Sequence, residues 1–296
     1  MKMINLLAVV FITAANMACT QSELPETSSN ICKFYDGRME EDDSRVTLAD
    51  SYMINWEMDD QLSIFPQYDV NSLYKVIATN ESRASFEFVS TEDKESNAID
   101  AHYAVYPYHS KNSMSNGVIT TQFPAEIEYS GKENSIHHAV MTAKSENNSF
   151  TFTNAMGILR LKVNAKQPFM IGKVQTIQLK SKTKGLCGTV TIDYSDNRQA
   201  PPAMIEATVD NRTLTINLVD DLQKDLVKAD ANEKYSEFYI PLAPEIFEAN
   251  DLLLIIKGSR DTYSKYIGCS IHIERKKIFT LTHTISALSY DGDIEN

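Results

Sequence analysis

The sequence predicts an all-β protein built from two β-sandwich halves. Residues 149–163 alternate apolar and polar side chains: Phe150 and Phe152 lie on one face, and the pattern resumes at Leu159 after a break at residues 154–157. Period-2 alternation of this kind is typical of a half-buried strand. Similar segments lie on both sides of this stretch, and helical periodicity is almost absent. The 296 residues are enough for two domains of ordinary size.

Residues 1–18 have the features of an export signal. Lys2 precedes an apolar run over residues 4–15, which is too short to serve as a stable membrane span. The Ala18-Cys19 pair after it resembles a bacterial lipobox, which implies that Cys19 is diacylated and that the chain is cleaved in front of it. The alternative is an ordinary signal peptide cleaved near Ala18. Residues 19–30, rich in Ser, Thr, Glu and Pro, are predicted to be a flexible spacer.

The first half is predicted to span residues 31–167. Trp56, Leu62 and Ile64 are expected in its core, with a turn at residues 59–60 between their strands. Pro107 ends an aromatic strand, because proline cannot donate to a strand ladder. The strands expected before the central stretch cover residues 31–35, 44–48, 53–58, 61–65, 73–78, 84–89, 102–108, 117–123, 127–129 and 140–144.

The second half is predicted to span residues 168–296. Residues 258–261 are expected to be a hairpin turn, and Pro241 after Ile240 repeats the aromatic-and-proline pattern of Tyr106-Pro107. An acidic tail covers residues 286–296. The expected strands cover residues 174–179, 186–192, 213–218, 237–241, 252–257, 266–274 and 277–285.

Charge and motif content exclude several functions. The net charge of −12 argues against a nucleic-acid partner, because phosphate binding needs a basic surface. The sequence has no nucleophile elbow, zinc-protease motif or phosphate-binding glycine loop, so we predict neither an enzyme nor a cofactor. His137 and His138 are the only neighbouring histidines, and adjacent strand residues face opposite ways, so no metal site is predicted. The neighbouring carboxylates at residues 40–43 and 220–221 lie in segments predicted to be loops, so we interpret them as solvated and not as a catalytic pair.

Three cysteines follow Cys19: Cys32, Cys187 and Cys269. An odd number in an exported chain leaves at least one of them unpaired. Cys187 and Cys269 have strand-like neighbours and are interpreted as buried free thiols. A disulfide between these two is the alternative.

An ordered set of segments resembles the fimbrillin family, the subunits of type V pili and their surface-lipoprotein relatives in Gram-negative anaerobes. These segments cover most of residues 31–165, whereas the second half resembles the family only in its general succession of strand-like segments. They are residues 44–46 (Ser-Arg-Val), 56–64 (Trp-Glu-Met-Asp-Asp-Gln-Leu-Ser-Ile), 103–108 (Tyr-Ala-Val-Tyr-Pro-Tyr), 141–144 (Met-Thr-Ala-Lys) and 152–161 (Phe-Thr-Asn-Ala-Met-Gly-Ile-Leu-Arg-Leu).

The resemblance implies two tandem transthyretin-like β-sandwich domains, exported as a lipoprotein to the outer membrane through Cys19. It also implies that a trypsin-like protease cuts after an arginine near the first strand. A strand from a neighbouring pilin subunit then fills the groove that the lost strand leaves. Arg45 is the best-matching cut site, and Arg38 is the alternative.

The tail departs from the expected donor strand. Ala287, Leu288, Tyr290 and Ile294 are its apolar residues, but Gly292 and three acids interrupt them. The tail is therefore predicted to be a weak donor, as in a subunit that accepts a strand without giving one. Without cleavage, the protein would be an anchor or a plain surface lipoprotein.

The predicted function is that of a structural subunit of a surface fimbria that serves adhesion. One rival is a non-polymerising surface lipoprotein that binds glycan or host protein through exposed Tyr103, Tyr106 and Tyr108. Another rival is a carbohydrate-active enzyme, which would need paired carboxylates across a cleft.

Overall fold

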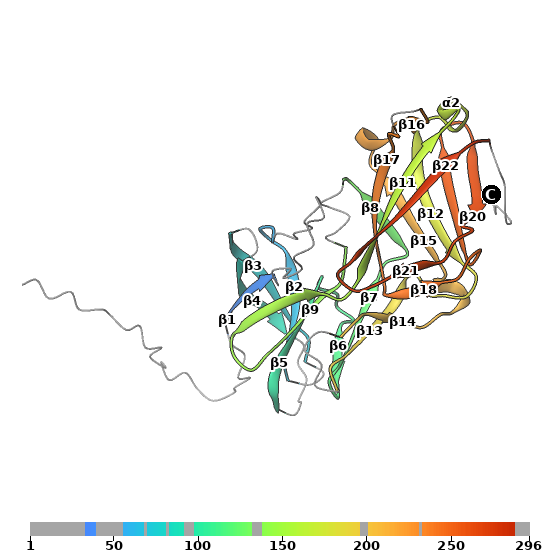
Figure 1. The fold of residues 1–296 in the computed structure, drawn as a ribbon. Helices are drawn as coiled ribbons and strands as arrows, with labels where there is room; N and C mark the ends of the chain where they lie inside the picture. Colours follow the sequence, from blue (N-terminus) through green and yellow to red (C-terminus); the bar gives the residue numbers. More distant parts are fainter. Residues whose placement is uncertain are drawn as a thin grey trace, which may run out of the picture. The chain divides into compact units, whose positions relative to one another are not determined.

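The computed structural model is all-β, as predicted (Figure 1). Among the described residues the only α-helix is the four-residue α2 (Pro168–Ile171), and two 3-10 turns are η1 (Val209–Asn211) and η2 (Asp220–Leu222). The structure describes residues 33–39, 56–67, 70–80, 83–91, 98–131, 138–195, 201–230 and 233–287.

Seven strands form a closed barrel in the order β1-β10-β9-β5-β2-β3-β4. Every neighbouring pair is antiparallel except β1 and β10, which run parallel. β1 therefore closes the barrel, with one edge on β4 and the other on β10. The strands are β1 (Phe34–Met39), β2 (Gln61–Gln67), β3 (Ser72–Asn80), β4 (Arg83–Thr91), β5 (Ala98–Tyr106), β9 (Met141–Ser145) and β10 (Ser149–Asn154).

Aromatic rings fill the barrel. Trp56, the only tryptophan, contacts three of them edge-on, with centroid distances of 5.0 Å to Phe152, 5.1 Å to Phe86 and 5.5 Å to Tyr106. Edge-on pairs of this kind are favoured by the ring quadrupoles. Leu62 and Ile64 are also fully buried here, so the predicted core positions around Trp56 are confirmed.

The central stretch passes from the barrel to a second set of sheets. β10 ends at Asn154 and β11 (Gly157–Ala165) begins three residues later, at the predicted break. The Asn154 side chain accepts a hydrogen bond from the Met156 amide at 2.8 Å, which fixes the turn. Phe150 and Phe152 thus enter the barrel core, whereas Leu159 and Leu161 enter a different core.

The other strands form four sheets. β11 has β22 on one side in parallel and β17 on the other side in antiparallel orientation. The remaining strands are β6 (Ser113–Ser115), β7 (Val118–Phe123), β8 (Glu126–Tyr129), β12 (Val174–Ser181), β13 (Gly188–Asp193), β14 (Met204–Ile205), β15 (Thr213–Leu218), β16 (Val227–Lys228), β17 (Ser236–Leu242), β18 (Glu245–Phe247), β19 (Leu252–Gly258), β20 (Thr262–Tyr266), β21 (Ile271–Ile273) and β22 (Ile278–Ile285).

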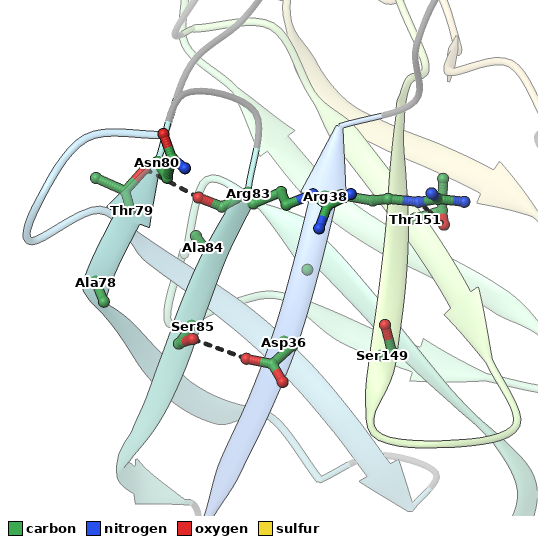
Figure 2. Close-up of a pocket in the computed structure, with 11 residues that line it drawn as sticks. Asp36, Arg38, Ala78, Thr79, Asn80, Arg83, Ala84, Ser85, Ser149 and Thr151 are labelled. Atoms are coloured by element: carbon green, nitrogen blue, oxygen red, sulfur yellow. Dashed lines mark hydrogen bonds between the residues drawn. The ribbon is translucent and has the colours of Figure 1, made fainter.

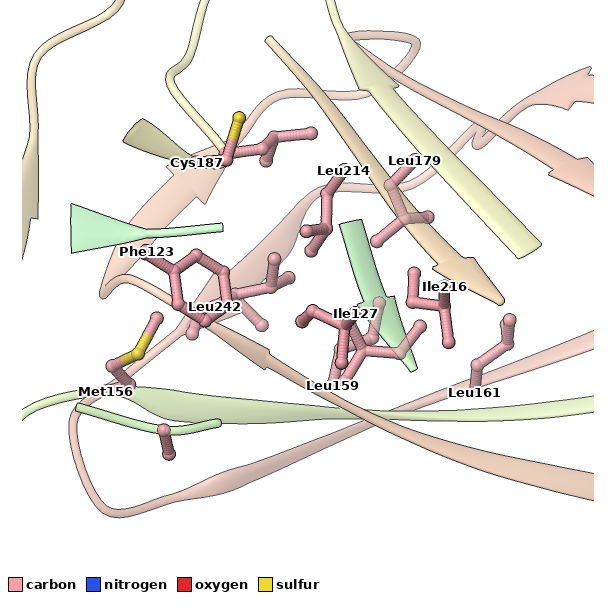
Figure 3. Packing of buried hydrophobic residues seen from close by; sticks show 14 of the residues in the cluster. Phe123, Ile127, Met156, Leu159, Leu161, Leu179, Cys187, Leu214, Ile216 and Leu242 are labelled. Carbon is pink, nitrogen blue, oxygen red and sulfur yellow. The ribbon is translucent and has the colours of Figure 1, made fainter. Parts of the chain in front are cut away.

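A large aliphatic core holds these sheets together. Figure 3 shows part of it, where Phe123, Ile127, Met156 and Leu242 gather with the β11 residue Leu159. Phe123 and Ile127 come from β7 and β8, which lie before the central stretch in the chain. β7 pairs with β13 and β8 pairs with β15, so strand pairing crosses the predicted domain boundary at residue 167.

Two predicted strand details are corrected. The hairpin partner of β19 is β20, Thr262–Tyr266, and the region predicted as one strand over residues 266–274 instead contains the short β21, which pairs with β18. Pro241 lies inside β17 instead of ending a strand as Pro107 does. Among the described strands β17 pairs along its length only with β11, and proline is tolerated on such an edge strand.

Candidate functional site

The first strand is the candidate functional element, because it is the strand that the predicted maturation removes. Its side chains alternate strictly: Tyr35, Gly37 and Met39 are buried, and Phe34, Asp36 and Arg38 are exposed. In Figure 2, β1 runs between β4 and β10. We call the space that it fills the β1 slot, formed by residues 83–87 of β4, residues 149–152 of β10 and the buried rings beneath them.

Tyr35 occupies the aromatic part of the β1 slot. Its ring centroid lies 5.3 Å from those of Tyr74 and Phe150 and 5.5 Å from that of His102. Its hydroxyl shares a hydrogen bond of 2.8 Å with Nδ1 of His102. Burial lowers the pKa of His102, which keeps the imidazole neutral. The slot therefore selects an aromatic residue that carries a polar tip.

Gly37 lies at the centre of β1, where there is no room for a side chain. A Cβ added there would overlap Phe86, with its Cζ at 2.8 Å, and would lie 3.0 Å from Cε2 of Phe152. Both rings are fully buried against Trp56 and cannot move aside freely. Gly37 is therefore required by space, because the rings of β4 and β10 pass directly over it.

Met39 completes the inner face of β1. It is buried and lies beside Phe152 in the parallel ladder. The inner face thus reads aromatic, glycine, aliphatic at alternate positions. β1 fills its slot with this sequence of sizes.

The outer face of β1 lines a concave polar surface. It encloses about 580 Å³, and its lining includes Asp36, Arg38, Arg83, Ser85, Ser149 and Thr151 (Figure 2). Ser85 Oγ donates a hydrogen bond of 2.7 Å to Asp36 Oδ1, and Arg38 Nε donates one of 3.3 Å to Thr151 Oγ1.

One pair of like charges occupies opposed positions on this face. Arg38 lies directly opposite Arg83 in the antiparallel ladder with β4. Like charges at directly opposed positions destabilise a strand pair. β1 is thus held by its inner face and by Asp36, and it is opposed by the charge at its fifth residue.

Of the three predicted processing residues, the structure describes only Arg38. Cys19 and Arg45 lie outside the described residues, so lipidation and cleavage there stay predictions. Arg38 lies within β1, where the ladder holds both edges of the strand. A protease binds an unpaired extended segment, so cleavage after Arg38 would first require β1 to leave the barrel.

The aromatic residues of the rival binding function are largely buried. Tyr103 and Tyr106 are only 7% and 5% exposed. The Tyr106 hydroxyl donates to Asp60 Oδ1 at 3.0 Å, and the Tyr103 ring packs edge-on against Tyr194. Tyr108 is half-buried. Tyr103 and Tyr106 are therefore structural, as expected for aromatic core strands, and do not form an exposed binding surface.

The remaining predicted groups form no chemical centre. Within the described part of the chain no three His, Cys, Asp or Glu side chains are grouped to hold a metal ion. Cys187 is buried and Cys269 is exposed, and both are free, so the alternative of a disulfide between them is wrong, as is the expected burial of Cys269. Asp220 and Asp221 are exposed in η2. No helix in the described ranges is both long and apolar enough to span a membrane.

Sequence reasoning missed Gly37 and the parallel pairing of β1 with β10. A glycine at the centre of an alternating segment is the signal that could have revealed the close approach of the rings. The parallel pairing leaves no comparable local signal, because it joins residues more than 100 positions apart.

Neither a family profile nor a curated protein sequence matches the chain. A solved structure of a "putative cell adhesion protein" from Bacteroides ovatus is similar in fold, with a TM-score of 0.50 and 20% identity over 86% of this chain and 92% of that one. Two others have lower scores. They are another "putative cell adhesion protein" from Bacteroides uniformis (TM-score 0.46, 13% identity, 85% and 92% covered) and a fimbrial protein from Bacteroides vulgatus (TM-score 0.34, 13% identity, 87% and 97% covered). The similarity in fold agrees with the resemblance to the fimbrillin family.

Proposed function

We propose that this chain is a structural subunit of a cell-surface fimbria that serves adhesion. It is made as a precursor tethered to the outer membrane through lipid on Cys19. A trypsin-like protease removes the first strand by cutting after Arg45, and the subunits polymerise by donor-strand exchange. The two halves correspond in this proposal to transthyretin-like domains. Other pilin subunits are the principal partners, and host protein or glycan is the target of adhesion.

The observation that carries the proposal is the place of β1 in the barrel. β1 alone closes the sheet between β4 and β10, and its buried residues rest on a cluster of aromatic rings. Loss of β1 would leave two unpaired edges and would expose Phe86, Phe150 and Phe152 to water. A donated strand then gains ladder hydrogen bonds and apolar contacts together, which is the physical basis of strand addition.

Cleavage and release are separate steps in this scheme. A cut after Arg45 leaves β1 in place, because the ladder, Tyr35 and Met39 still hold it without a covalent link. β1 leaves only when another strand competes for its slot. The cut subunit therefore stays folded until it meets a donor, and its apolar rings stay covered.

The test is the mature N-terminus, determined by mass spectrometry on fimbriae sheared from cells and on the outer-membrane fraction. We expect sheared protein that begins at Val46 and carries no lipid. Arg45→Ala should abolish both this species and the sheared polymer, whereas Arg38→Ala should leave both unchanged. A lipidated start at Cys19 in every fraction would overturn the proposal, and a non-polymerising surface lipoprotein would replace it.

A further inference from the structure

Two arginines lie side by side on the concave polar surface of the barrel. Arg38 and Arg83 are both exposed and are directly opposed in the β1–β4 ladder. The hydrogen bond from the Phe88 amide to the Lys33 carbonyl, 3.0 Å, sets the phase of this ladder. The two arginines are therefore a pair without mutual backbone hydrogen bonds, and the Cα atoms of such a pair lie about 4.5 Å apart.

No carboxylate in the described part of the chain forms an ion pair with either arginine. Arg38 Nε donates to Thr151 Oγ1, and Figure 2 shows the Arg83 side chain extending from β4 toward β1. The whole chain carries a net charge of −12, so acids to neutralise a basic pair are abundant in it. A basic pair that stays without one favours an external anion, because a guanidinium matches the paired oxygens of an oxyanion.

The rest of the surface suits a hydroxylated ligand. Its apolar lining is limited to one glycine and two alanines, which offers nothing to a lipid chain. Its volume of about 580 Å³ falls within the range of roughly 300–1,000 Å³ that small-molecule sites have, and it exceeds what a single inorganic anion needs. The other polar lining residues are Thr79, Asn80, Ser85, Ser149 and Thr151.

Asp36 gives this surface a second, negative end. It lies two residues before Arg38 on the same face of β1, which is about 6.8 Å along the strand. Its Oδ1 accepts a hydrogen bond of 2.7 Å from Ser85. A carboxylate can only accept hydrogen bonds, so it repels an inorganic anion but can accept from the hydroxyl of a sugar. The spacing matches the span of one pyranose ring with its substituents.

We propose that this surface binds an acidic saccharide, a sugar that carries a carboxylate or a sulfate group. Arg38 and Arg83 bind the acidic group, and Asp36 accepts a hydrogen bond from a sugar hydroxyl. The inference goes beyond the proposed function, because the site needs only the barrel with β1 in place and requires no cleavage. Since its ligand contacts both β1 and β4, the bound sugar also holds β1 in the barrel.

Calorimetric titration of the uncut chain tests the class of ligand. The protein is made without its lipid, in a Cys269→Ser background that removes the exposed free thiol. The probes are glucuronate, galacturonate and N-sulfoglucosamine, with glucose and inorganic sulfate as controls. We expect an acidic sugar to bind at least about tenfold more tightly than either control, because only the acidic sugar contacts both ends of the surface. Equal affinity for inorganic sulfate, or no binding of any acidic sugar, would overturn the proposal.

Substitutions on the surface locate the site. Arg38→Gln and Arg83→Gln should each weaken binding of the acidic sugar by roughly 10- to 150-fold, and each removes a like-charge opposition, so the fold is retained. Lys180→Gln removes the same charge from an exposed position on β12 and should have no effect. Asp36→Ala should weaken binding of the sugar but not of inorganic sulfate. Equal effects of Arg83→Gln and Lys180→Gln would overturn the site.

Hydrogen exchange tests whether the ligand contacts both strands. Departure of β1 destroys the site, so a bound sugar must disfavour this opening. With free sugar at about nine times its Kd, protection of the β1 amides should rise about tenfold, and the Arg83→Gln chain should show no such rise at the same concentration. Binding without a change in β1 protection would overturn the proposal. A chain that binds the sugar but never polymerises would contradict the proposed function alone.

Discussion

Gly37 shows how the packing of buried rings can require a residue without a side chain. Its backbone is in an ordinary extended conformation, so its role is spatial: it leaves room for the rings of Phe86 and Phe152. The packing of these rings against Trp56 makes the position rigid. A protein interior of this density responds to the addition of a single methyl group.

Gly37→Ala should destabilise the chain by about 1–3 kcal/mol through overpacking. Gly268→Ala is the matched control, because a Cβ there meets nothing within 4 Å, and its effect should stay within about 0.5 kcal/mol. Chemical denaturation followed by tryptophan fluorescence measures both, since Trp56 lies in the affected cluster. Equal effects of the two substitutions would show that the rings over Gly37 can move aside.

His102 makes the hold on Tyr35 sensitive to pH. Burial lowers the pKa of His102 in the folded chain, so protonation favours the unfolded chain. The stability that the neutral ring contributes is complete above the ordinary histidine pKa of about 6.5 and is lost as the pH falls through the lower, folded value. The pKa of His283, which is half-buried beside Tyr263 and close to Lys265, is shifted in the same direction.

We therefore expect the Tm to fall between pH 7 and pH 5, and His102→Gln to reduce this fall. His272→Gln is the control, because His272 is exposed on β21. Thermal unfolding at a series of pH values measures the effect. A His102→Gln chain that keeps the whole acid sensitivity would assign it to His283 or to other groups.

At the scale of the element, β1 is a strand held from both sides but by few residues. Six residues supply all of its ladder contacts, and three of them supply its burial. A covalent link to either neighbour should therefore prevent its exchange without altering the fold. Asp36 and Ser85 are suited to this link, because they are directly opposed on the outer face.

Asp36→Cys with Ser85→Cys, in the Cys269→Ser background, should form a disulfide that keeps β1 in the barrel after trypsin cleavage. Polymerisation should then stop and should resume on addition of a reductant. Gln178→Cys with Thr215→Cys, opposed on β12 and β15, is the matched control and should leave polymerisation unchanged. Polymer growth at full rate with β1 locked would mean that subunits associate by another surface.

The sequence predicted individual strands better than their partners. Alternation located β10, β11, β12, β15 and β22, because the period of two is imposed locally by burial of one face. Alternation could not assign β7 and β8 to the sheets of β13 and β15. The residues of β7 and β8 give no local signal of a partner that lies more than 60 positions away in the sequence. Gly37 was overlooked for the same reason, since the rings that require it come from β4 and β10.

At the scale of the whole described chain, two hydrophobic cores are joined by the central stretch. One core is rich in aromatic residues and lies in the barrel, and the other is mostly aliphatic and lies among the remaining sheets and against the outside of β2 and β5. Tyr194, a member of the second core, contacts two strands of the barrel: its hydroxyl donates to Thr142 Oγ1 of β9 at 2.8 Å, and its ring packs edge-on against Tyr103 of β5. Composition and alternation predicted the all-β class, but the closed barrel followed from one pairing, β1 with β10, that only the structure revealed.

The position of β1 between two neighbours has a mechanical consequence. A strand that is drawn along its own axis from between two ladders loads all of its hydrogen bonds in shear, so they must break together and not one after another. Residues Tyr35 and Met39 would also have to pass the rings of Phe86 and Phe152 as the strand slides. A strand held in this geometry resists tension far better than it resists peeling from one end, which would suit the proposed polymer of subunits when flow stretches it.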